Sequence, residues 1–182
     1  ITSISVSPLN SKVIWVGTDD GNVWTSTDGG GTWTKVSASL PKRWVSRVVA
    51  DLTDENAALV CLSGYRHADD MAHIYQTKNQ GLDWQTVSAG LPDIPVNDLI
   101  IDPSDPENVW IIATDAGVYF TATAGQNWLP FNSNLPTVPI TDLSFHAATR
   151  TLLAATFGRA MYTIQLPNLT IGTKTPQVAE NV

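Results

Sequence analysis

The densest group of side chains that could do chemistry lies between residues 64 and 73. Phenol, guanidinium, imidazole and carboxylate groups occur there close together. They belong to Tyr65, Arg66, His67, Asp69, Asp70 and His73. Oxygen and imidazole ligands could gather around calcium or a transition metal ion, but this spacing matches no established metal motif. We therefore expect a solvated interaction loop and no metal site, because binding residues concentrate on loops of rigid scaffolds.

A second set of candidates is a pair of carboxylates, Asp98 and Asp142, which occupy equivalent places in two repeated segments. Two carboxyl groups about 6.5 to 9.5 Å apart can serve as acid and base of an inverting glycosidase. The alternative, which we favour, is structural: the carboxylates form ion pairs with Arg47 or Arg159. We therefore assign no catalytic residue and expect no cofactor.

The elements that position these groups form an internal repeat, and its clearest part is a turn at residues 26–33. An aspartate followed by glycines favours a tight turn, because the carboxylate accepts nearby amide hydrogen bonds and glycine readily adopts positive φ. Two less regular copies occur at 77–84 and 121–128. The shared turn positions are Ser26, Asp28, Gly30, Thr32 and Trp33 in the first copy, Thr77, Asn79, Gly81 and Trp84 in the second, and Thr121, Gly125 and Trp128 in the third. We expect all three tryptophans to be buried beside their turns.

Apolar segments recur with the same period. Aligned on the turns, the repeats begin at residues 1, 45, 96 and 140, a spacing typical of four-stranded propeller blades. The second strand of each repeat is almost continuously apolar, as in sheets that are covered on both faces. The sequence thus predicts an all-β fold, a β-propeller of antiparallel blades over residues 1–166, followed by a linker or an added strand over 167–182.

About four blades are present, which is too few for the usual closed ring. We therefore expect the C-terminal part of a larger propeller, whose partners are the remaining blades of the same propeller or a second copy of the chain. An isolated chain is not expected to close into a monomeric ring.

The pattern Ser/Thr-x-Asp-x-Gly-x-Thr-Trp at residues 26–33 resembles the Asp-box, also called the bacterial neuraminidase repeat. It is similar to the repeat of sialidases, xyloglucan-cleaving propeller enzymes, sortilin-like receptors and many secreted bacterial propellers. This resemblance implies a structural role for the turns and leaves the activity open, because unrelated functions share the box. The Arg-Ile-Pro signature of sialidases does not occur in the sequence. Residues 156–162 are similar to the end of the last blade in secreted relatives, which implies an extracellular, periplasmic or cell-surface location.

The resemblance also implies where binding residues gather. In propellers, the connections between blades and the turns between second and third strands emerge on one face. By position this face holds the loop 64–73, Arg43, Trp44 and Arg159, and Arg47 rims the channel. We expect a non-catalytic binding or scaffolding segment of a larger extracytoplasmic protein. The alternative is a fragment of a glycoside hydrolase of the xyloglucan-cleaving type.

The composition of the chain limits the classes of partner that it could bind. The chain has 182 residues and a formal net charge of −7, so it could not neutralise a run of nucleic-acid phosphates. No apolar segment approaches the roughly 20 residues that span a bilayer, so membrane insertion is not expected. The single cysteine, Cys61, lies in an apolar run and is expected to fill the core. A protein or glycan ligand stays open.

Overall fold

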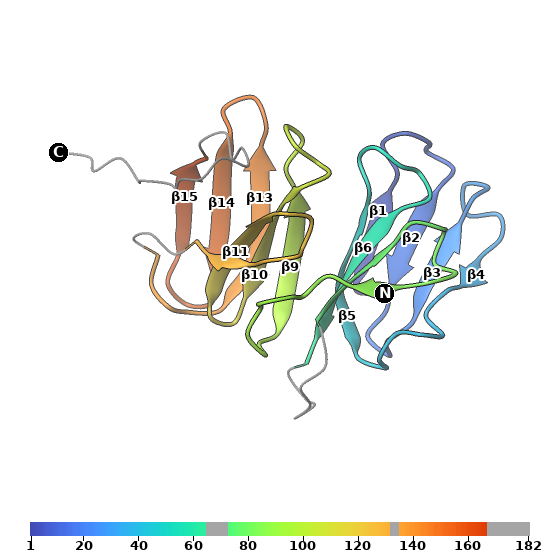
Figure 1. Cartoon of the computed structure of the whole chain (residues 1–182), viewed down its shortest axis with the longest axis horizontal. Helices are drawn as coiled ribbons and strands as arrows, with labels where there is room; N and C mark the ends of the chain where they lie inside the picture. Colours follow the sequence, from blue (N-terminus) through green and yellow to red (C-terminus); the bar gives the residue numbers. More distant parts are fainter. Residues whose placement is uncertain (65–72, 132–134, 167–182) are drawn as a thin grey trace.

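The computed structural model describes residues 1–64, 73–131 and 135–166, which form four antiparallel sheets (Figure 1). We call these sheets blades 1 to 4. Blade 1 contains β1 (Ser3–Val6), β2 (Ile14–Gly17), β3 (Val23–Ser26) and β4 (Thr34–Lys35). Blade 2 contains β5 (Trp44–Ala50), β6 (Ala58–Ser63), β7 (Ile74–Thr77) and β8 (Gln85–Thr86). Blade 3 contains β9 (Val96–Ile101), β10 (Val109–Thr114), β11 (Gly117–Ala122) and β12 (Leu129–Pro130), and blade 4 contains β13 (Ile140–His146), β14 (Thr151–Thr156) and β15 (Met161–Gln165).

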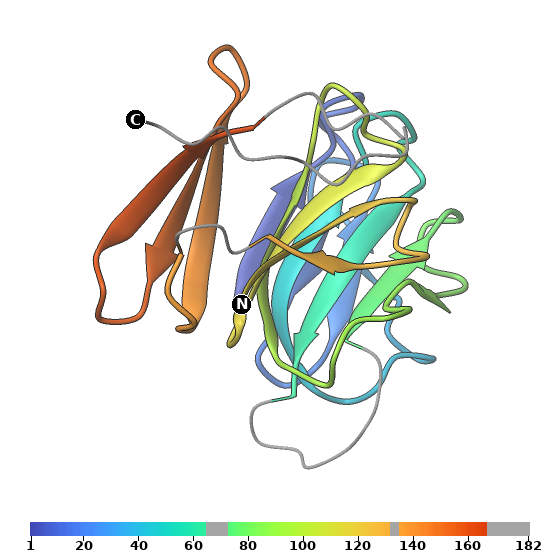
Figure 2. The same cartoon turned by 60° about the vertical axis from the view of Figure 1, so that its left-hand side comes forward.

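Strands follow one another across each sheet in chain order, so each blade is a meander. The first strands β1, β5, β9 and β13 contact one another in series and form the inner edge of the arrangement. Figures 1 and 2 show the successive sheets side by side. This is the architecture of β-propeller blades, as the sequence predicted. The part of the chain that the structure describes contains no helix, and therefore none that could cross a membrane.

The core lies between the blades. Three apolar clusters fill the spaces between blades 1 and 2, 2 and 3, and 3 and 4. Every residue of β10 is buried, and β6 is buried from Ala58 to Leu62, because both faces of these strands are covered. Cys61 is buried in this core, and its burial raises the pKa of its thiol well above the ordinary value.

Blade 4 differs from the other three blades. Within the described residues it has three strands, and β15 forms its edge. Met161 on β15 and Phe157 in the preceding turn are strongly exposed. The strand that the sequence suggested after residue 166 lies outside the described residues.

Candidate functional site

Polar contacts join the inner strands from each blade to the next. In the first three repeats, the second residue donates a side-chain hydrogen bond to the carbonyl oxygen of the first residue of the following repeat. These bonds run from Thr2 Oγ1 to Val45 O (2.6 Å), from Ser46 Oγ to Val96 O (2.5 Å) and from Asn97 Nδ2 to Ile140 O (2.9 Å). These bonds join the start of each inner strand to the start of the next one. Thr141 holds the same position in blade 4, and its hydroxyl donates to Ala155 of its own sheet instead.

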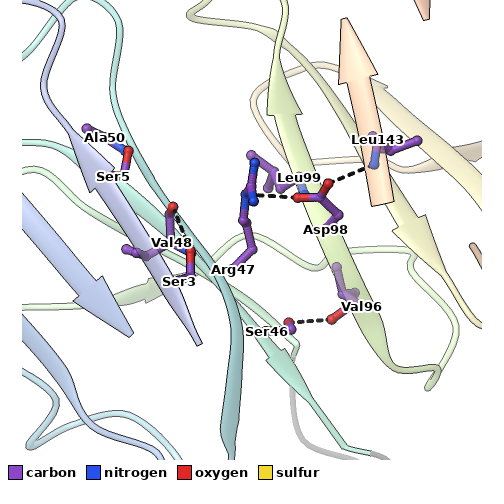
Figure 3. A network of polar contacts seen from close by, with 10 residues as sticks. All are labelled: Ser3, Ser5, Ser46, Arg47, Val48, Ala50, Val96, Asp98, Leu99 and Leu143. Atoms are coloured by element: carbon purple, nitrogen blue, oxygen red, sulfur yellow. Dashed lines mark hydrogen bonds and ion pairs between the residues drawn. The ribbon is translucent and has the colours of Figure 1, made fainter. Parts of the chain in front are cut away.

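The third residues of the first three repeats, Ser3, Arg47 and Asp98, make a second set of contacts (Figure 3). The backbone N–H of Val48 donates to Ser3 Oγ at 3.0 Å. The N–H of Leu143 donates to Asp98 Oδ2 at 2.8 Å in the same way. Arg47 cannot accept such a bond, and its Nε instead lies 2.9 Å from Asp98 Oδ1. One carboxylate therefore ties together blades 2, 3 and 4.

Asp98 is only 2% exposed, and it also accepts a hydrogen bond from the N–H of Leu99. Burial raises the pKa of Asp98, although the Leu143 N–H and the Arg47 guanidinium oppose this effect. Asp142, the other candidate acid, is exposed. Of the two kinds of pairing expected from the sequence, the described residues form the Arg47–Asp98 pair, and no ion pair joins Asp142 to Arg159.

A cavity of about 1020 Å³ opens at the end of the inner strands. Its walls come from two repeated positions: the openings of the inner strands and the turns between second and third strands. The lining residues that carry useful chemistry are Asp19, Trp44, Asn97, Asp115, Thr141 and Phe157. Trp44 and Phe157 are exposed and offer ring faces, while Asp19 and Asp115 offer carboxylates. Asn97 Nδ2 donates to Asp115 Oδ1 at 2.9 Å and holds that carboxylate in place. The ring faces of such a surface can stack on a sugar or on an apolar side chain, and its carboxylates can accept hydrogen bonds from the polar groups of a ligand.

Sequence reasoning placed Trp44 on this face and missed Asp19, Asp115 and Phe157. The signal was available, because all three residues begin the turn between the second and third strands of their repeats. Arg159 is exposed in the same turn as Phe157. Arg47 is partly exposed and lies on the inner strand β5.

Arg43 and His73, which the sequence suggested as binding residues, are buried. His73 Nδ1 lies 3.1 Å from the carbonyl oxygen of Leu62, and its Nε2 lies 2.8 Å from Asp93 Oδ1. Burial lowers the pKa of Arg43, against the opposing influence of Tyr75 and Asp93. The Nε2 contact places Asp93, in the connection between blades 2 and 3, against His73. Because they are buried, Arg43 and His73 do not form an exposed binding surface.

The remaining residues of the proposed loop, Tyr65, Arg66, His67, Asp69 and Asp70, lie outside the described residues. Within the described ranges, no group of three or more histidine, cysteine, aspartate or glutamate side chains is placed to hold a metal ion.

The three repeated turns, which we call box turns, share one hydrogen-bond pattern. The first hydroxyl accepts from the N–H of the glycine four residues later. The bonds run from Gly30 N to Ser26 Oγ (2.9 Å), from Gly81 N to Thr77 Oγ1 (2.9 Å) and from Gly125 N to Thr121 Oγ1 (3.1 Å). The acceptor at the third position closes the other half of the turn, receiving the N–H of Thr32 at Asp28, of Asp83 at Asn79 and of Asn127 at Thr123. The box turns are therefore structural, and Asp28 is fully engaged within its own turn.

The prediction that all three box tryptophans are buried is wrong for Trp33. Trp128 is 3% exposed and Trp84 is partly buried, whereas Trp33 is 42% exposed. Trp84 and Trp128 each pack against the blade that precedes their own. Among the described residues, Trp33 has no such contact with another blade, so the same sequence motif leaves Trp33 more exposed.

No protein-family model matches the chain, and no curated protein matches its sequence. Solved structures do match its fold. A GH74 enzyme from Niastella koreensis aligns with a TM-score of 0.66 and 17% identity, over 90% of this chain and 22% of that one. The GH74 xyloglucanase from Xanthomonas campestris aligns with a TM-score of 0.69 and 13% identity, over 91% of this chain and 29% of that one.

A structure of YCF48 bound to D1 peptide aligns with a TM-score of 0.65 and 17% identity, over 93% of this chain and 52% of that one. The β-propeller domain of Cps50 (Swd1) from Myceliophteria thermophila aligns with a TM-score of 0.70 and 14% identity, over 96% of this chain and 55% of that one. At these identities the likeness shows the fold alone. The chain is thus similar to part of a β-propeller, and it spans between about one fifth and just over half of these four proteins.

Proposed function

We propose that the chain is a non-catalytic binding or scaffolding segment of a larger Asp-box β-propeller, of the kind found in sortilin-like and other secreted proteins. The observation that carries this proposal is the state of Asp98. A general acid or base must reach its substrate, yet this carboxylate is buried and bound by Leu99, Leu143 and Arg47. The contacts of Asp98 join blade 3 to blades 2 and 4.

The ligand of this segment, a protein or a glycan, would bind in the cavity at the end of the inner strands. Trp44 and Phe157 would supply ring faces, and Asp115 would orient polar groups of the ligand. We keep the binding role that the sequence predicted for Tyr65, Arg66, His67, Asp69 and Asp70 as part of this proposal. The similarity to YCF48, solved with a bound peptide, and to the xyloglucan-cleaving enzymes makes peptides and xyloglucan oligosaccharides the first ligands to test.

The test is a binding titration of the purified chain against a peptide library and against xyloglucan oligosaccharides. Trp44→Ala and Phe157→Ala should weaken binding without lowering the melting temperature, because both side chains are exposed. Leu9→Ala, which removes an exposed apolar side chain away from the cavity lining, is the matched control. Binding that survives both cavity substitutions would contradict this location. Replacing residues 65–72 with a short glycine and serine linker tests the contribution of the loop separately.

The alternative function is that of a glycoside hydrolase fragment of the xyloglucan-cleaving type, which the similarity to two GH74 enzymes favours. In that case Asp98 and Asp142 would be the catalytic pair. Release of reducing sugar from xyloglucan that is abolished by Asp142→Asn, in a folded variant, would establish this alternative. The non-catalytic proposal expects no release from the unmodified chain.

A further inference from the structure

The outer face of blade 1 exposes apolar side chains that the other blades bury. Ser3 and Ser5 bond to blade 2, so the alternate residues of β1 point the opposite way. These residues are Ile4, which is 60% exposed, and Val6, which is 49% exposed. The equivalent exposures are 1% for Val48 and 2% for Ala50 in blade 2, and 1% for Leu99 and 4% for Ile101 in blade 3. An apolar surface of this kind marks an interface.

The box turn of blade 1 also lacks contacts that the other two turns make. Trp84 Nε1 donates to the carbonyl oxygen of Val36 at 2.8 Å, and Trp128 Nε1 donates to that of Val87 at 2.7 Å. Both acceptors lie three residues after the tryptophan of the preceding blade. Trp33 Nε1 instead donates to Gly30 of its own turn, at 3.1 Å.

The box glycines show the same difference. A Cβ on Gly81 would lie 2.6 Å from Val36 Cβ, and a Cβ on Gly125 would lie 2.6 Å from Val87 O. A Cβ on Gly30 would meet only its own Trp33, at 3.6 Å. In blades 2 and 3 the preceding blade presses on the glycine, and in blade 1 that place is open.

We propose that the outer face of blade 1 docks a complete four-stranded blade of this same repeat, an inference that rests on the proposed role as a segment of a larger propeller. The outer strand of the partner receives the Trp33 indole N–H on a backbone carbonyl and lays a valine-sized side chain over Gly30. The inner strand of the partner carries a hydroxyl or amide donor for the carbonyl of Ile1, as Thr2 does for Val45. Its next residue accepts the N–H of Ile4, as Ser3 accepts that of Val48.

The described residues of a second copy match only half of these requirements. Blade 4 offers a donor at Thr141 and an acceptor at Asp142, which suit the inner-strand contacts, and its described strands end at β15. The proposed partner is a blade with an outer strand of its own, because the carbonyl groups that receive Trp84 and Trp128 directly follow the outer strands β4 and β8.

The test is to graft such a blade onto the full chain. Residues 1–44 are duplicated in front of Ile1, which preserves the spacing at which Trp44 leads into the next blade. The added copy supplies the residues that correspond to Thr2, Ser3 and Val36. It carries Trp33→Phe, so that the signal of Trp33 comes only from the original blade 1, whose Trp33 we call the resident Trp33. Hydrogen exchange of the indole N–H groups is followed by NMR, with Trp84 and Trp128 as internal controls. Exchange at the resident Trp33 should slow by about tenfold or more and approach that of Trp128.

The matched control is the same graft with Val36→Glu in the added copy, which places a charge over Gly30 and should remove the protection of Trp33. A second graft, residues 96–139 with Phe131→Val, repeats the test with the donor and acceptor of blade 3.

If neither graft yields a folded chain with a protected Trp33, the proposal is wrong. Protection of Trp33 in the unextended chain, through a dimer, would make a second copy the occupant and also overturn it. A graft that protects Trp33 while no ligand binds the cavity would leave the docking inference intact and count against the proposed binding function alone.

Discussion

Arg150 of blade 4 pairs with Asp102 of blade 3 through two contacts, 2.8 Å from Nη2 to Oδ2 and 3.2 Å from Nη1 to Oδ1. Asp102 is 1% exposed on its side chain, and Arg150 also lies over the ring of Phe145. The pair joins blades 3 and 4 at the end of the sheets opposite the cavity.

Replacing Arg150 with methionine should lower the free energy of unfolding by about 1–3 kcal/mol at neutral pH, because a buried carboxylate loses its partner. Burial disfavours the charged form of Asp102, but hydrogen bonds from Arg150 and Ser104 outweigh it and hold the pKa of Asp102 below its ordinary value. The stabilisation is therefore present above the unfolded-state pKa and is lost as the pH falls through the folded-state pKa. Urea denaturation should show the cost of the variant shrinking towards acid pH. Arg159→Met, which changes an exposed arginine, is the control and should cost less than about 0.5 kcal/mol.

Asp98 and Asp142 are both the third residue of their repeats, but Asp98 is buried and Asp142 is exposed. Comparing Asp98→Ala with Asp142→Ala therefore separates the effect of burial from that of the place in the repeat. The first should cost about 1–3 kcal/mol, because the N–H groups of Leu99 and Leu143 lose their acceptor. The second should cost less than about 0.5 kcal/mol. The raised pKa of Asp98 gives its contribution the opposite pH dependence to that of Asp102: it is fully present below the unfolded-state pKa and declines as the pH rises through the folded-state pKa. Denaturation curves at several pH values check both statements, and equal costs for the two variants would contradict the structural role of Asp98.

Trp128→Ala should lower the free energy of unfolding by about 3–5 kcal/mol, because it empties a buried site between blades 2 and 3. Trp33→Ala should cost less than about 1 kcal/mol in the same assay, because the Trp33 side chain is exposed and bonds only within its own turn. The two variants are matched in residue type and in place within the box turn. A large cost for Trp33 in the isolated chain would mean that another surface already covers it.

The carboxyl group of Asp28 should titrate with a pKa of about 2 when followed by NMR. The backbone N–H of Thr32 contributes most to this lowering, followed by the hydroxyl groups of Thr32 and Ser26. Thr32→Val removes one of these donors and should raise the pKa of Asp28, whereas Thr27→Val, on an exposed neighbour, should not. An unchanged titration in Thr32→Val would show that the hydroxyl does not bond the carboxylate in solution.

The sequence by itself determined the repeat, the strands and the box turns. The bonds of a box turn join residues at most four positions apart, as between Ser26 and Gly30, so the local residue types are sufficient to specify them. The apolar second strands predicted sheets that are covered on both faces. This prediction was possible because the residue pattern along a strand reflects the average environment of that strand.

Only the tertiary structure decided which copy of a repeated residue is buried and which is exposed. Trp33 and Trp128 hold one motif position, and Asp98 and Asp142 hold another, yet one of each pair is covered by a neighbouring blade and the other is not. The burial of Arg43 and His73 could not be predicted from the repeat either, since it depends on residues distant in the sequence, such as Asp93 for His73. Local sequence specifies a blade, and the environment of each side chain is then set by the adjacent blade, which no spacing within a single repeat encodes.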